Sequence, residues 1–389
     1  MSLAGSQQKV FLRLLAALRP HWRRDQTLPA RVQALFAANR SFGSRDRKLY
    51  RELIYTTLRF LPWIEPLLDS DPARATQIAA WLAADLPATR AFRTAHCGDW
   101  PPCPAAVAAK AAHLSASPEA LFPAWFVRHC PAAADAANLD ALHTRAARWL
   151  RLQTPDPAHV LEEFVRLGWP CRPTPVLPGA LELLAEADVT TTAAWRDGFV
   201  EVQDLGSQLV LGAADIAPGG RWLDACAGAG GKTLQLAALL GPGGHVDAYD
   251  IRPTALRELA VRTARAKLTR VSILAAPAIA SYDGVLVDAP CTGSGTWRRA
   301  PHLKWTTSAG DVAKSAERQT ALLAEFCARV RPGGRLIYAT CSLSRMENEE
   351  VVAAFLAAHA NFAADAPART ILPATHNTDG FFVAALRRR

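Results

Sequence analysis

The sequence lacks the patterns that would mark a metal-binding, membrane or repeat protein. None of its 8 cysteines belongs to a C-x-x-C pair, and no cysteine–histidine spacing matches a zinc site. No uncharged stretch is long enough, and poor enough in glycine and proline, to span a bilayer. The sequence shows no secretory signal, no internal repeat and no low-complexity segment. These absences favour a soluble cytoplasmic protein with reduced thiols, which binds no metal and contacts no membrane.

The composition is globular, and the charge is uneven. Of the 389 residues, 50% are hydrophobic and 20% are charged. This composition excludes wholesale disorder, and the length predicts two or three domains. Residues 1–60 hold twelve basic and three acidic residues, an excess of nine that equals the net charge of +9 of the whole chain. Such a basic block favours a polyanion as partner, and a solvated basic helix surface is the alternative.

Three parts are predicted along the chain. Residues 1–144 are expected to form a helical domain, because leucines recur at helical spacing and prolines cut the remainder into short helices. Residues 145–204 predict a small α+β connector. Residues 205–389 alternate strand and helix, which predicts a mostly parallel sheet covered on both faces, with ligands beyond the carboxyl ends of its strands. The strands of this part are predicted at 221–225, 245–249, 271–274, 284–288, 335–340 and 381–386.

A glycine-rich loop follows the first of these strands. It reads Asp224-Ala225-Cys226-Ala227-Gly228-Ala229-Gly230-Gly231-Lys232-Thr233. Glycines let the backbone approach a ligand, and the next helix offers free N–H groups, although a plain tight turn is the alternative. The loop ends like a phosphate-binding P-loop, but Cys226 stands where that motif needs its first glycine, which disfavours an NTPase.

An acidic residue, Asp250, closes the next strand. Its carboxylate could accept both hydroxyls of a ribose or cap the helix that begins near residue 253. Together with the glycine-rich loop, it favours a nucleoside-bearing cofactor, which is either a dinucleotide or S-adenosylmethionine.

Two cysteines follow the ends of two later strands. Cys291 lies in Asp288-Ala289-Pro290-Cys291, and Cys341 lies in Thr340-Cys341-Ser342. Either cysteine alone would be read as a buried turn residue. Ser344 and Glu347 are predicted to form a capping box for the helix 346–359, and the N-terminus of that helix favours the thiolate form of Cys341.

These motifs resemble those of the Sun-type RNA cytosine-5 methyltransferases. The segments 288–291 and 340–342 are similar to two motifs of that family, and 224–233 is similar to its cofactor loop. The segments 44–47 and 55–59 are similar to the NusB-like N-terminal domain of the RsmB branch, which acts on small-subunit ribosomal RNA. The resemblance implies an all-α NusB-like RNA-binding domain followed by a Rossmann-like class I methyltransferase domain, whose mostly parallel sheet has seven strands.

The resemblance also implies a mechanism and a cofactor site. In the family a thiolate adds to C6 of cytosine, which makes C5 nucleophilic toward the methyl group of S-adenosylmethionine. This role falls on Cys341, while Cys291 assists product release and Asp288 contacts the cytosine. The residues implied to bind the cofactor are Cys226, Ala227, Gly228, Ala229, Gly230, Gly231, Lys232, Asp250 and Asp288. The expected protein is a monomer that methylates 16S rRNA; a tRNA methyltransferase, or a catalytically weakened RNA-binding or ribosome-assembly factor, is the alternative.

Two positions depart from the family pattern. Ala229 stands where the family loop usually has proline, and Ala276 stands where an aspartate binds the adenine amino group. Loss of that one polar contact could lower cofactor affinity by about 1–3 kcal/mol.

Basic and aromatic residues follow Cys291 directly, in the segment 297–305. Arginine and lysine can hold phosphates, and tryptophan can stack on an unpaired base. The alternative is a surface loop with its tryptophans anchored in the core. The residues predicted to contact RNA are Arg298, Arg299, Lys304, Arg45 and Arg47.

Overall fold

The computed structural model describes residues 2–277 and 281–389, and the chain divides into two compact units. One unit comprises Met1–Arg145 with Thr296–Ser308, and the other comprises Ala146–Gly295 with Ala309–Arg389. The predicted connector and the predicted sheet domain therefore lie in one unit. The segment that follows Cys291, by contrast, leaves that unit for the N-terminal one.

The N-terminal unit is helical. Helix α3 (Ser44–Arg59) is rich in basic residues. It buries Leu49 and Leu53 and exposes Arg45, Lys48 and Arg51. Aspartates cap two of the later helices through side-chain hydrogen bonds to backbone N–H groups. The other helices are α1 (Leu3–Leu18), α2 (Leu28–Ala38), α4 (Leu61–Ile64), α5 (Leu67–Ser70), α6 (Pro72–Leu82), α7 (Arg90–Cys97), α8 (Val107–Leu114), α9 (Phe126–His129), α10 (Ala136–Leu142) and α16 (Leu303–Thr306).

A small antiparallel sheet begins the second unit. Its strand order is β2-β3-β1-β4, with β1 (Arg148–Leu152), β2 (Cys171–Pro173), β3 (Ala180–Leu183) and β4 (Val200–Val202). Helix α11 (Pro157–Arg166) packs Val160 and Phe164 into the core of this sheet. The short helix α12 (Ala193–Arg196) precedes β4.

A large, mostly parallel sheet forms the rest of this unit. In the described residues its order is β10-β12-β9-β8-β5-β6-β7, and β11 pairs with β12. The pairs among β5 to β9 are parallel, and the pairs of β12 are antiparallel. The strands are β5 (Gly220–Asp224), β6 (Gly244–Ala248), β7 (Val271–Ile273), β8 (Tyr282–Asp288), β9 (Val330–Thr340), β10 (Phe362–Ala364), β11 (Arg369–Ile371) and β12 (Phe381–Arg388). The predicted Rossmann-like sheet is thus confirmed, with the short edge strand β11 added.

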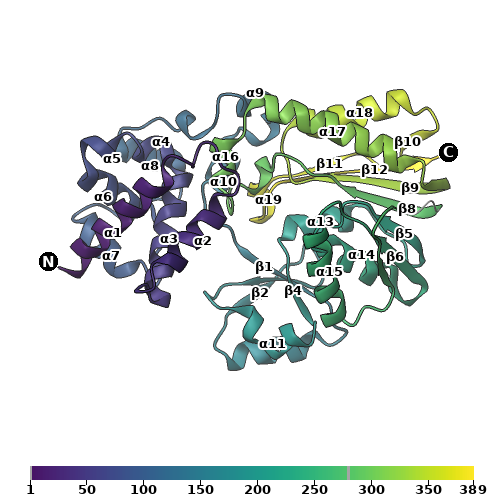
Figure 1. Ribbon diagram of the computed structural model, residues 1–389, viewed down its shortest axis with the longest axis horizontal. Coiled ribbons are helices and arrows are strands. Elements are labelled where there is room, and N and C mark those ends of the chain that lie inside the picture. The colour runs from purple at the N-terminus through teal and green to yellow at the C-terminus, as the bar shows by residue number, and fades with distance from the viewer. Residues whose placement is uncertain (1, 278–280) are drawn as a thin grey trace. The chain divides into compact units, whose positions relative to one another are not determined.

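Helices cover both faces of the large sheet (Figure 1). Alternate strand residues point to opposite faces, so Val285 and Val287 share a core with α17 and α18. Leu286, between them, packs instead with residues of α13 and α14. The bounds are α13 (Leu205–Ala213), α14 (Gly231–Leu240), α15 (Pro253–Arg265), α17 (Ala309–Cys327), α18 (Glu349–Ala358) and α19 (Pro373–His376). This layering leaves the carboxyl ends of the parallel strands as one shared edge.

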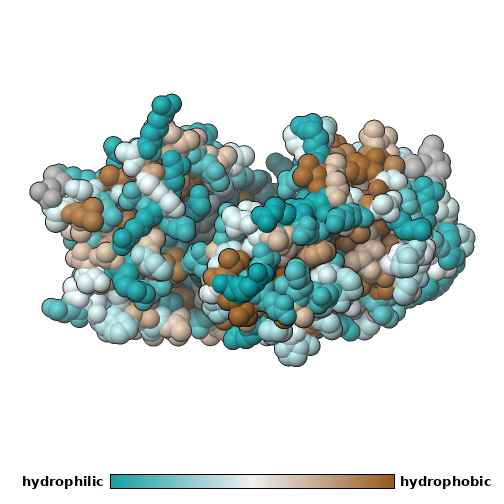
Figure 2. Space-filling view, turned by 90° about the horizontal axis from the view of Figure 1, so that it is seen from below, coloured by the Kyte–Doolittle hydropathy of each residue, from teal (hydrophilic) through white to brown (hydrophobic). Residues whose placement is uncertain are grey.

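One face of the molecule is largely hydrophilic. Figure 2 shows hydrophilic residues over much of the face in view, with hydrophobic residues in separate patches. Among residues 2–277 and 281–389, no helix has both the length and the apolar character needed to cross a membrane.

Candidate active site

Four neighbouring strands end at one edge of the large sheet and carry the predicted site. Asp224 at the end of β5 pairs in register with Ala248 of β6 and Leu286 of β8. Asp288 at the end of β8 pairs with Ala339 of β9. The loops that follow these strands hold the glycine-rich segment, Asp250, Cys291 and Cys341, so the topology brings all four features to the same edge.

The glycine-rich loop turns tightly before α14. Gly228 and Gly230 have φ angles of 54° and 91°, a region that side-chain-bearing residues rarely adopt. A Cβ atom at Gly230 would lie 2.2 Å from Cδ1 of Leu259, whereas one at Gly231 would meet nothing within 4 Å. The loop therefore packs closely on its inner side and leaves open space at the first residue of α14, where free N–H groups can meet a ligand.

The Asp250 carboxylate braces this loop. Its Oδ2 accepts a hydrogen bond of 2.8 Å from the backbone N–H of Gly228. The Arg252 side chain donates to both carboxylate oxygens, each at 2.9 Å. Burial opposes ionisation of Asp250, but the hydrogen bonds from Arg252 and Gly228 outweigh it and lower its pKa. Because Arg252 is largely exposed, it can turn away and free the carboxylate for a ribose.

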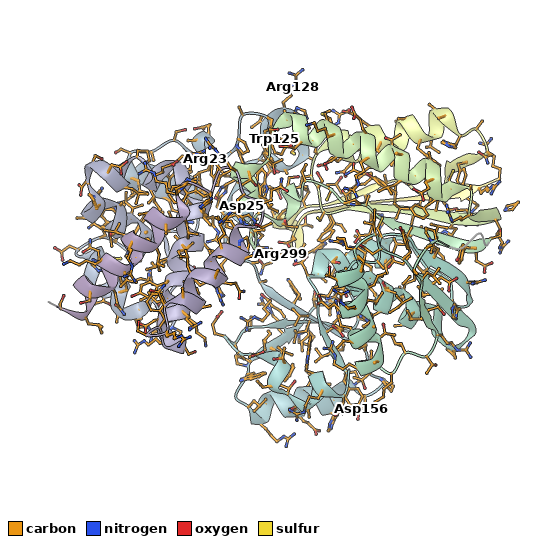
Figure 3. The ribbon with its side chains drawn as sticks, viewed as in Figure 1. Arg23, Asp25, Trp125, Arg128, Asp156 and Arg299 are labelled. Carbon is orange, nitrogen blue, oxygen red and sulfur yellow. The ribbon has the colours of Figure 1, made fainter. Side chains whose placement is uncertain are left out.

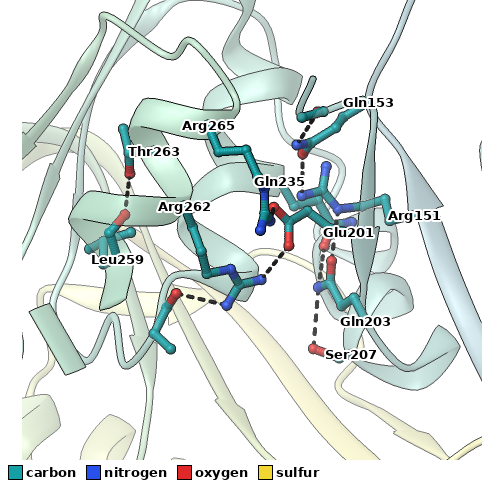
Figure 4. Close-up of polar contacts among 12 residues, drawn as sticks. Arg151, Gln153, Glu201, Gln203, Ser207, Gln235, Leu259, Arg262, Thr263 and Arg265 are labelled. Carbon is teal, nitrogen blue, oxygen red and sulfur yellow. Dashed lines mark hydrogen bonds and ion pairs between the residues drawn. The ribbon is translucent and has the colours of Figure 1, made fainter. Parts of the chain in front are cut away.

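A buried cluster of charged side chains also supports the glycine-rich loop (Figure 4). Arg262 of α15 donates to the carbonyl oxygen of Ala229 at 2.7 Å and to Oε2 of Glu201 at 2.9 Å. Glu201 of β4 is only 1% exposed and also pairs with Arg265. The carbonyl at Ala229, where the family pattern has proline, is therefore held by a charged donor whose own position is fixed by the small sheet.

Asp224 at the start of the loop is a structural carboxyl. It is 1% exposed, and its Oδ2 accepts a hydrogen bond of 2.7 Å from the Thr233 hydroxyl. Burial, aided by the charge of Asp288, raises the pKa of Asp224 to about 7. The neighbouring Cys226 also has a raised pKa, because it is buried and faces several carboxylates. Cys226 therefore stays a thiol and does not compete as a nucleophile.

Lys232 reaches across the sheet edge to Asp288. The Nζ–Oδ2 distance is 2.9 Å, and the lysine side chain is 8% exposed against 30% for the aspartate. The ammonium also lies 5.1 Å from the ring centroid of Phe381. In a P-loop this lysine would be available to a phosphate; here it holds a carboxylate that stays partly exposed.

The two predicted cysteines meet. The Sγ atoms of Cys291 and Cys341 are 3.2 Å apart, in hydrogen-bond contact. Neither cysteine is part of a disulfide, and both are partly buried. The pKa of Cys291 is raised well above its ordinary value by the hydrogen bond to Cys341, by burial and by nearby negative charge. Either sulfur can be the donor in this contact.

The predicted capping box is wrong. Ser344 does precede a short 3₁₀ turn (Arg345–Glu347), but its hydroxyl has no hydrogen-bond partner among the described residues. The Glu347 carboxylate turns inward instead and accepts hydrogen bonds from Thr292 and Ser342, the residues that follow the two cysteines. These donors lie 55 and 5 residues away and satisfy the carboxylate better than a cap would. Helix α18 then begins only at Glu349.

The structure of the segment after Cys291 shows that two of the predicted RNA contacts are wrong. Arg298 and Lys304 are 2% and 1% exposed, so neither side chain faces solvent. Lys304 donates to the carbonyl oxygen of Arg59 at 2.8 Å, and Trp305 donates to that of Leu58 at 2.6 Å. These carbonyls belong to the last turn of α3, where no helical N–H remains to pair with them. The segment is thus a structural cap on a helix end.

The remaining predicted RNA contacts differ in exposure. Arg299 and Arg45 are exposed, and Figure 3 marks the place of Arg299. Arg47 is half-buried, and its Nε donates to the carbonyl oxygen of Phe42 at 3.0 Å, which steadies the turn before α3. Arg128 of α9, which sequence analysis did not single out, is exposed and points away from the ribbon (Figure 3).

Ala276 follows β7 and is exposed. Its methyl group can form no hydrogen bond. Residue 276 therefore cannot make the polar contact that an aspartate would make at the same position. Glu347, Gln319 and Arg262 are the functional candidates that sequence reasoning missed. The signal for Glu347 was its place six residues after Cys341, but the same spacing fits a helix cap equally well.

The sheet order, the glycine-rich loop after its first strand and the antiparallel strand β12 beside β9 define the class I methyltransferase fold. Residues 213–387 match the family described as 16S rRNA methyltransferase RsmB/F. The ribosomal RNA small subunit methyltransferase B of Yersinia pestis is 31% identical over 287 residues, which are 69% of this chain and 67% of that protein. The chain belongs to the RsmB/F family.

The chain covers a smaller share of the length of other relatives. The probable ribosomal RNA small subunit methyltransferase B of Bacillus subtilis is 32% identical over 258 residues, which are 60% of this chain and 58% of that protein. Among solved structures, PH0851 covers 97% of both chains with a TM-score of 0.73 and 21% identity. NSun6 from Pyrococcus horikoshii with SFG covers 69% of this chain and 98% of its own, with a TM-score of 0.61 and 19% identity. The two structures share the fold.

Proposed function

We propose that this chain transfers a methyl group from S-adenosylmethionine to C5 of a cytosine in 16S rRNA. The observation that carries the proposal is the pair of thiols 3.2 Å apart at the ends of two adjacent strands, beside the accessible carboxylate of Asp288. Membership of the RsmB/F family supports ribosomal RNA as the substrate. A class I fold with one thiol or none could transfer a methyl group, but it would lack this two-sulfur centre.

The thiols divide the reaction into two steps. The Cys341 sulfur forms a bond to C6, and the electrons of the C5–C6 double bond shift so that C5 becomes nucleophilic. After C5 has gained the methyl group, loss of the C5 proton and cleavage of the S–C6 bond restore the double bond and return the thiolate. Cys291 lies in place to assist this elimination. Asp288, fixed by Lys232, presents its other oxygen to the edge of the cytosine.

The residues at the sheet edge fit a nucleoside cofactor. The open space at Gly231 and the free N–H groups of α14 suit a ligand close to the backbone. Asp250 is positioned for ribose hydroxyls, and the residues from Cys226 to Lys232 line the approach. When bound, S-adenosylmethionine supplies an electrophilic methyl group. The chain's own contribution is to hold that group near the two thiols and to exclude water from them.

The proposal is tested with purified protein, tritiated S-adenosylmethionine and three RNAs: 16S rRNA from cells that lack this activity, the same RNA already methylated, and bulk tRNA. Methyl transfer is expected to the first RNA alone, as 5-methylcytosine at one position mapped by bisulfite sequencing. Transfer to tRNA instead would assign the substrate to the alternative. RNA binding without transfer to either substrate would contradict the enzymatic proposal and favour an assembly factor.

The Arg262 clamp on the glycine-rich loop gives a prediction about the cofactor. Arg262→Gln removes a charged hydrogen bond to Ala229, worth about 1.5–3 kcal/mol, so the affinity for S-adenosylmethionine is expected to fall roughly tenfold or more. Adding Ala229→Pro should recover part of the loss, because proline stiffens the same loop through its fixed φ. Isothermal titration calorimetry measures both effects.

Arg257→Gln is the matched control for this experiment, since Arg257 is an exposed residue of the same helix. It should bind the cofactor as the wild type does. Unchanged affinity in Arg262→Gln would show that the loop holds its shape without the clamp.

A further inference from the structure

One buried carboxylate joins the two cysteine-bearing loops. Glu347 is fully buried, and its partners are hydrogen-bond donors without charge. Oε1 accepts from the backbone N–H of Thr292 at 2.8 Å and from Nε2 of Gln319 at 3.1 Å. Oε2 accepts from the hydroxyls of Thr292 and Ser342, each at 2.5 Å. A single side chain therefore holds the residue after Cys291 and the residue after Cys341.

Gln319 extends this arrangement to α17. Its Nε2 donates to Glu347 and also to the carbonyl oxygen of Pro290, at 3.0 Å. Pro290 directly precedes Cys291, so the cysteine is held on both sides by groups that converge on the same carboxylate. The loops also meet where Ser294 contacts Ser342, with 3.1 Å between their hydroxyl oxygens. Hydrogen bonds between uncharged groups, such as that of Ser294 with Ser342, would be enough to hold the two loops together. A purely structural role would therefore not need a buried carboxylate.

We propose that Glu347 is the positioning residue that assigns the roles of the two thiols, keeping Cys291 protonated so that Cys341 is the sulfur that adds to C6. The inference rests on the proposed function. Its basis is geometric: the carboxylate fixes the loops that set the 3.2 Å contact between the sulfurs, and it accepts two hydrogen bonds from Thr292, next to Cys291, against one from Ser342, next to Cys341.

The electrostatics agree with this geometry. The charge of Glu347 is one of the causes that raise the pKa of Cys291, after the hydrogen bond to Cys341, burial and the charge of Cys341 itself. Tyr338 of β9 also faces this thiol, and its hydroxyl donates to the backbone carbonyl of Glu347. Burial keeps Tyr338 neutral by raising its pKa. Glu347 is therefore the carboxylate shared by the two cysteine-bearing loops.

The test separates the charge of Glu347 from its shape. Glu347→Gln keeps the size and one acceptor oxygen, and the hydroxyls of Thr292 and Ser342 can rotate to accept from the new amide. Glu349→Gln makes the same chemical change at an exposed carboxylate two residues further on and is the matched control. Each variant is alkylated with iodoacetamide across a pH series, and the Cys291 and Cys341 peptides are quantified by mass spectrometry.

In Glu347→Gln the pH midpoint for alkylation of Cys291 is expected to fall by about one unit, as for loss of a like charge nearby. In Glu349→Gln it should stay at the wild-type value. The kcat for methyl transfer is expected to fall up to about 100-fold, with the KM for RNA unchanged. An unchanged pH midpoint of Cys291 in Glu347→Gln would overturn the proposal. An equal loss of kcat in Glu347→Gln and Glu349→Gln would also overturn it. The alkylation profile needs no methyl transfer, so an inactive wild type would refute the proposed function and leave this test intact.

Glu347→Asp covers the case in which the glutamine variant does not fold. Aspartate keeps the charge but is one methylene shorter, so it cannot hold both loops. The midpoint of Cys291 should then remain near that of the wild type while kcat falls. Wild-type kcat in this variant would overturn the positioning role.

Discussion

Cys341→Ala is expected to reduce methyl transfer to 16S rRNA by at least about 10⁴-fold, which is the scale of losing a catalytic nucleophile. Cytosine C5 is a poor nucleophile until a group has added to C6, and alanine has nothing to add. Cys291 lies 3.2 Å from the lost sulfur, but burial and the charge of Glu347, which do not depend on Cys341, still raise its pKa. A thiol is a much weaker nucleophile than a thiolate, so Cys291 does not substitute.

The measurement is single-turnover transfer from labelled S-adenosylmethionine, with cofactor affinity and RNA affinity determined in parallel. Both affinities should stay close to wild type, because the change removes one sulfur atom and leaves the residues of the cofactor loop and the exposed basic residues unchanged. Cys171→Ala is the control, since Cys171 lies in the small sheet and should behave as wild type. Retained transfer in Cys341→Ala would show that the chemistry does not pass through this sulfur.

The site could be predicted from sequence where it follows from strand topology. Each of Asp224, Asp288 and Cys341 ends or follows a hydrophobic strand, and the carboxyl ends of parallel strands share one edge. Once the order of the strands is known, no fine detail is needed to bring these residues together. The alternation of strand and helix from residue 220 onward predicts a mostly parallel sheet, and the resemblance to a known family implies the order of its strands. The structure confirms the fold.

Glu347 could not be assigned in this way. A serine followed three residues later by a glutamate is a valid capping signal, and local sequence offers no reason to reject it. The outcome was decided by the hydroxyl and N–H groups of Thr292, a residue remote in sequence, together with Ser342. A buried carboxylate takes the most complete set of donors that the fold offers, and only the tertiary structure shows where those donors lie.

A related reason explains why the predicted RNA contacts of Arg298 and Lys304 were wrong in the segment 297–305. Its arginines, lysine and tryptophans have the composition of an RNA-binding loop, but the carbonyl groups at the end of α3 compete for the same donors. Lys304 also donates to Nε2 of His143 at 2.8 Å, and burial lowers the pKa of both groups. Composition identifies donors; it does not say whether phosphate or backbone will receive their hydrogen bonds.

Cys291→Ala is expected to halt the reaction after the Cys341–C6 bond has formed, so that a covalent protein–RNA complex accumulates. The Cys341 sulfur remains free to add, but the thiol that assists elimination is gone. In a denaturing gel with labelled 16S rRNA and S-adenosylmethionine, the complex should appear with Cys291→Ala and be absent from Cys341→Ala and from the double variant. Cys291→Ser, which keeps a hydroxyl in the same place, should accumulate less of it.

The same gel decides between the two sulfurs. A complex with Cys341→Ala and none with Cys291→Ala would make Cys291 the nucleophile, the order that resembles DNA cytosine methyltransferases. That order would require Cys291 to ionise first, against its hydrogen bond to Cys341, its burial and the charge of Glu347. Removing the charge should weaken this bias. Glu347→Gln combined with Cys341→Ala is therefore the variant in which any hidden reactivity of Cys291 would appear, and its adduct should exceed that of Cys341→Ala alone.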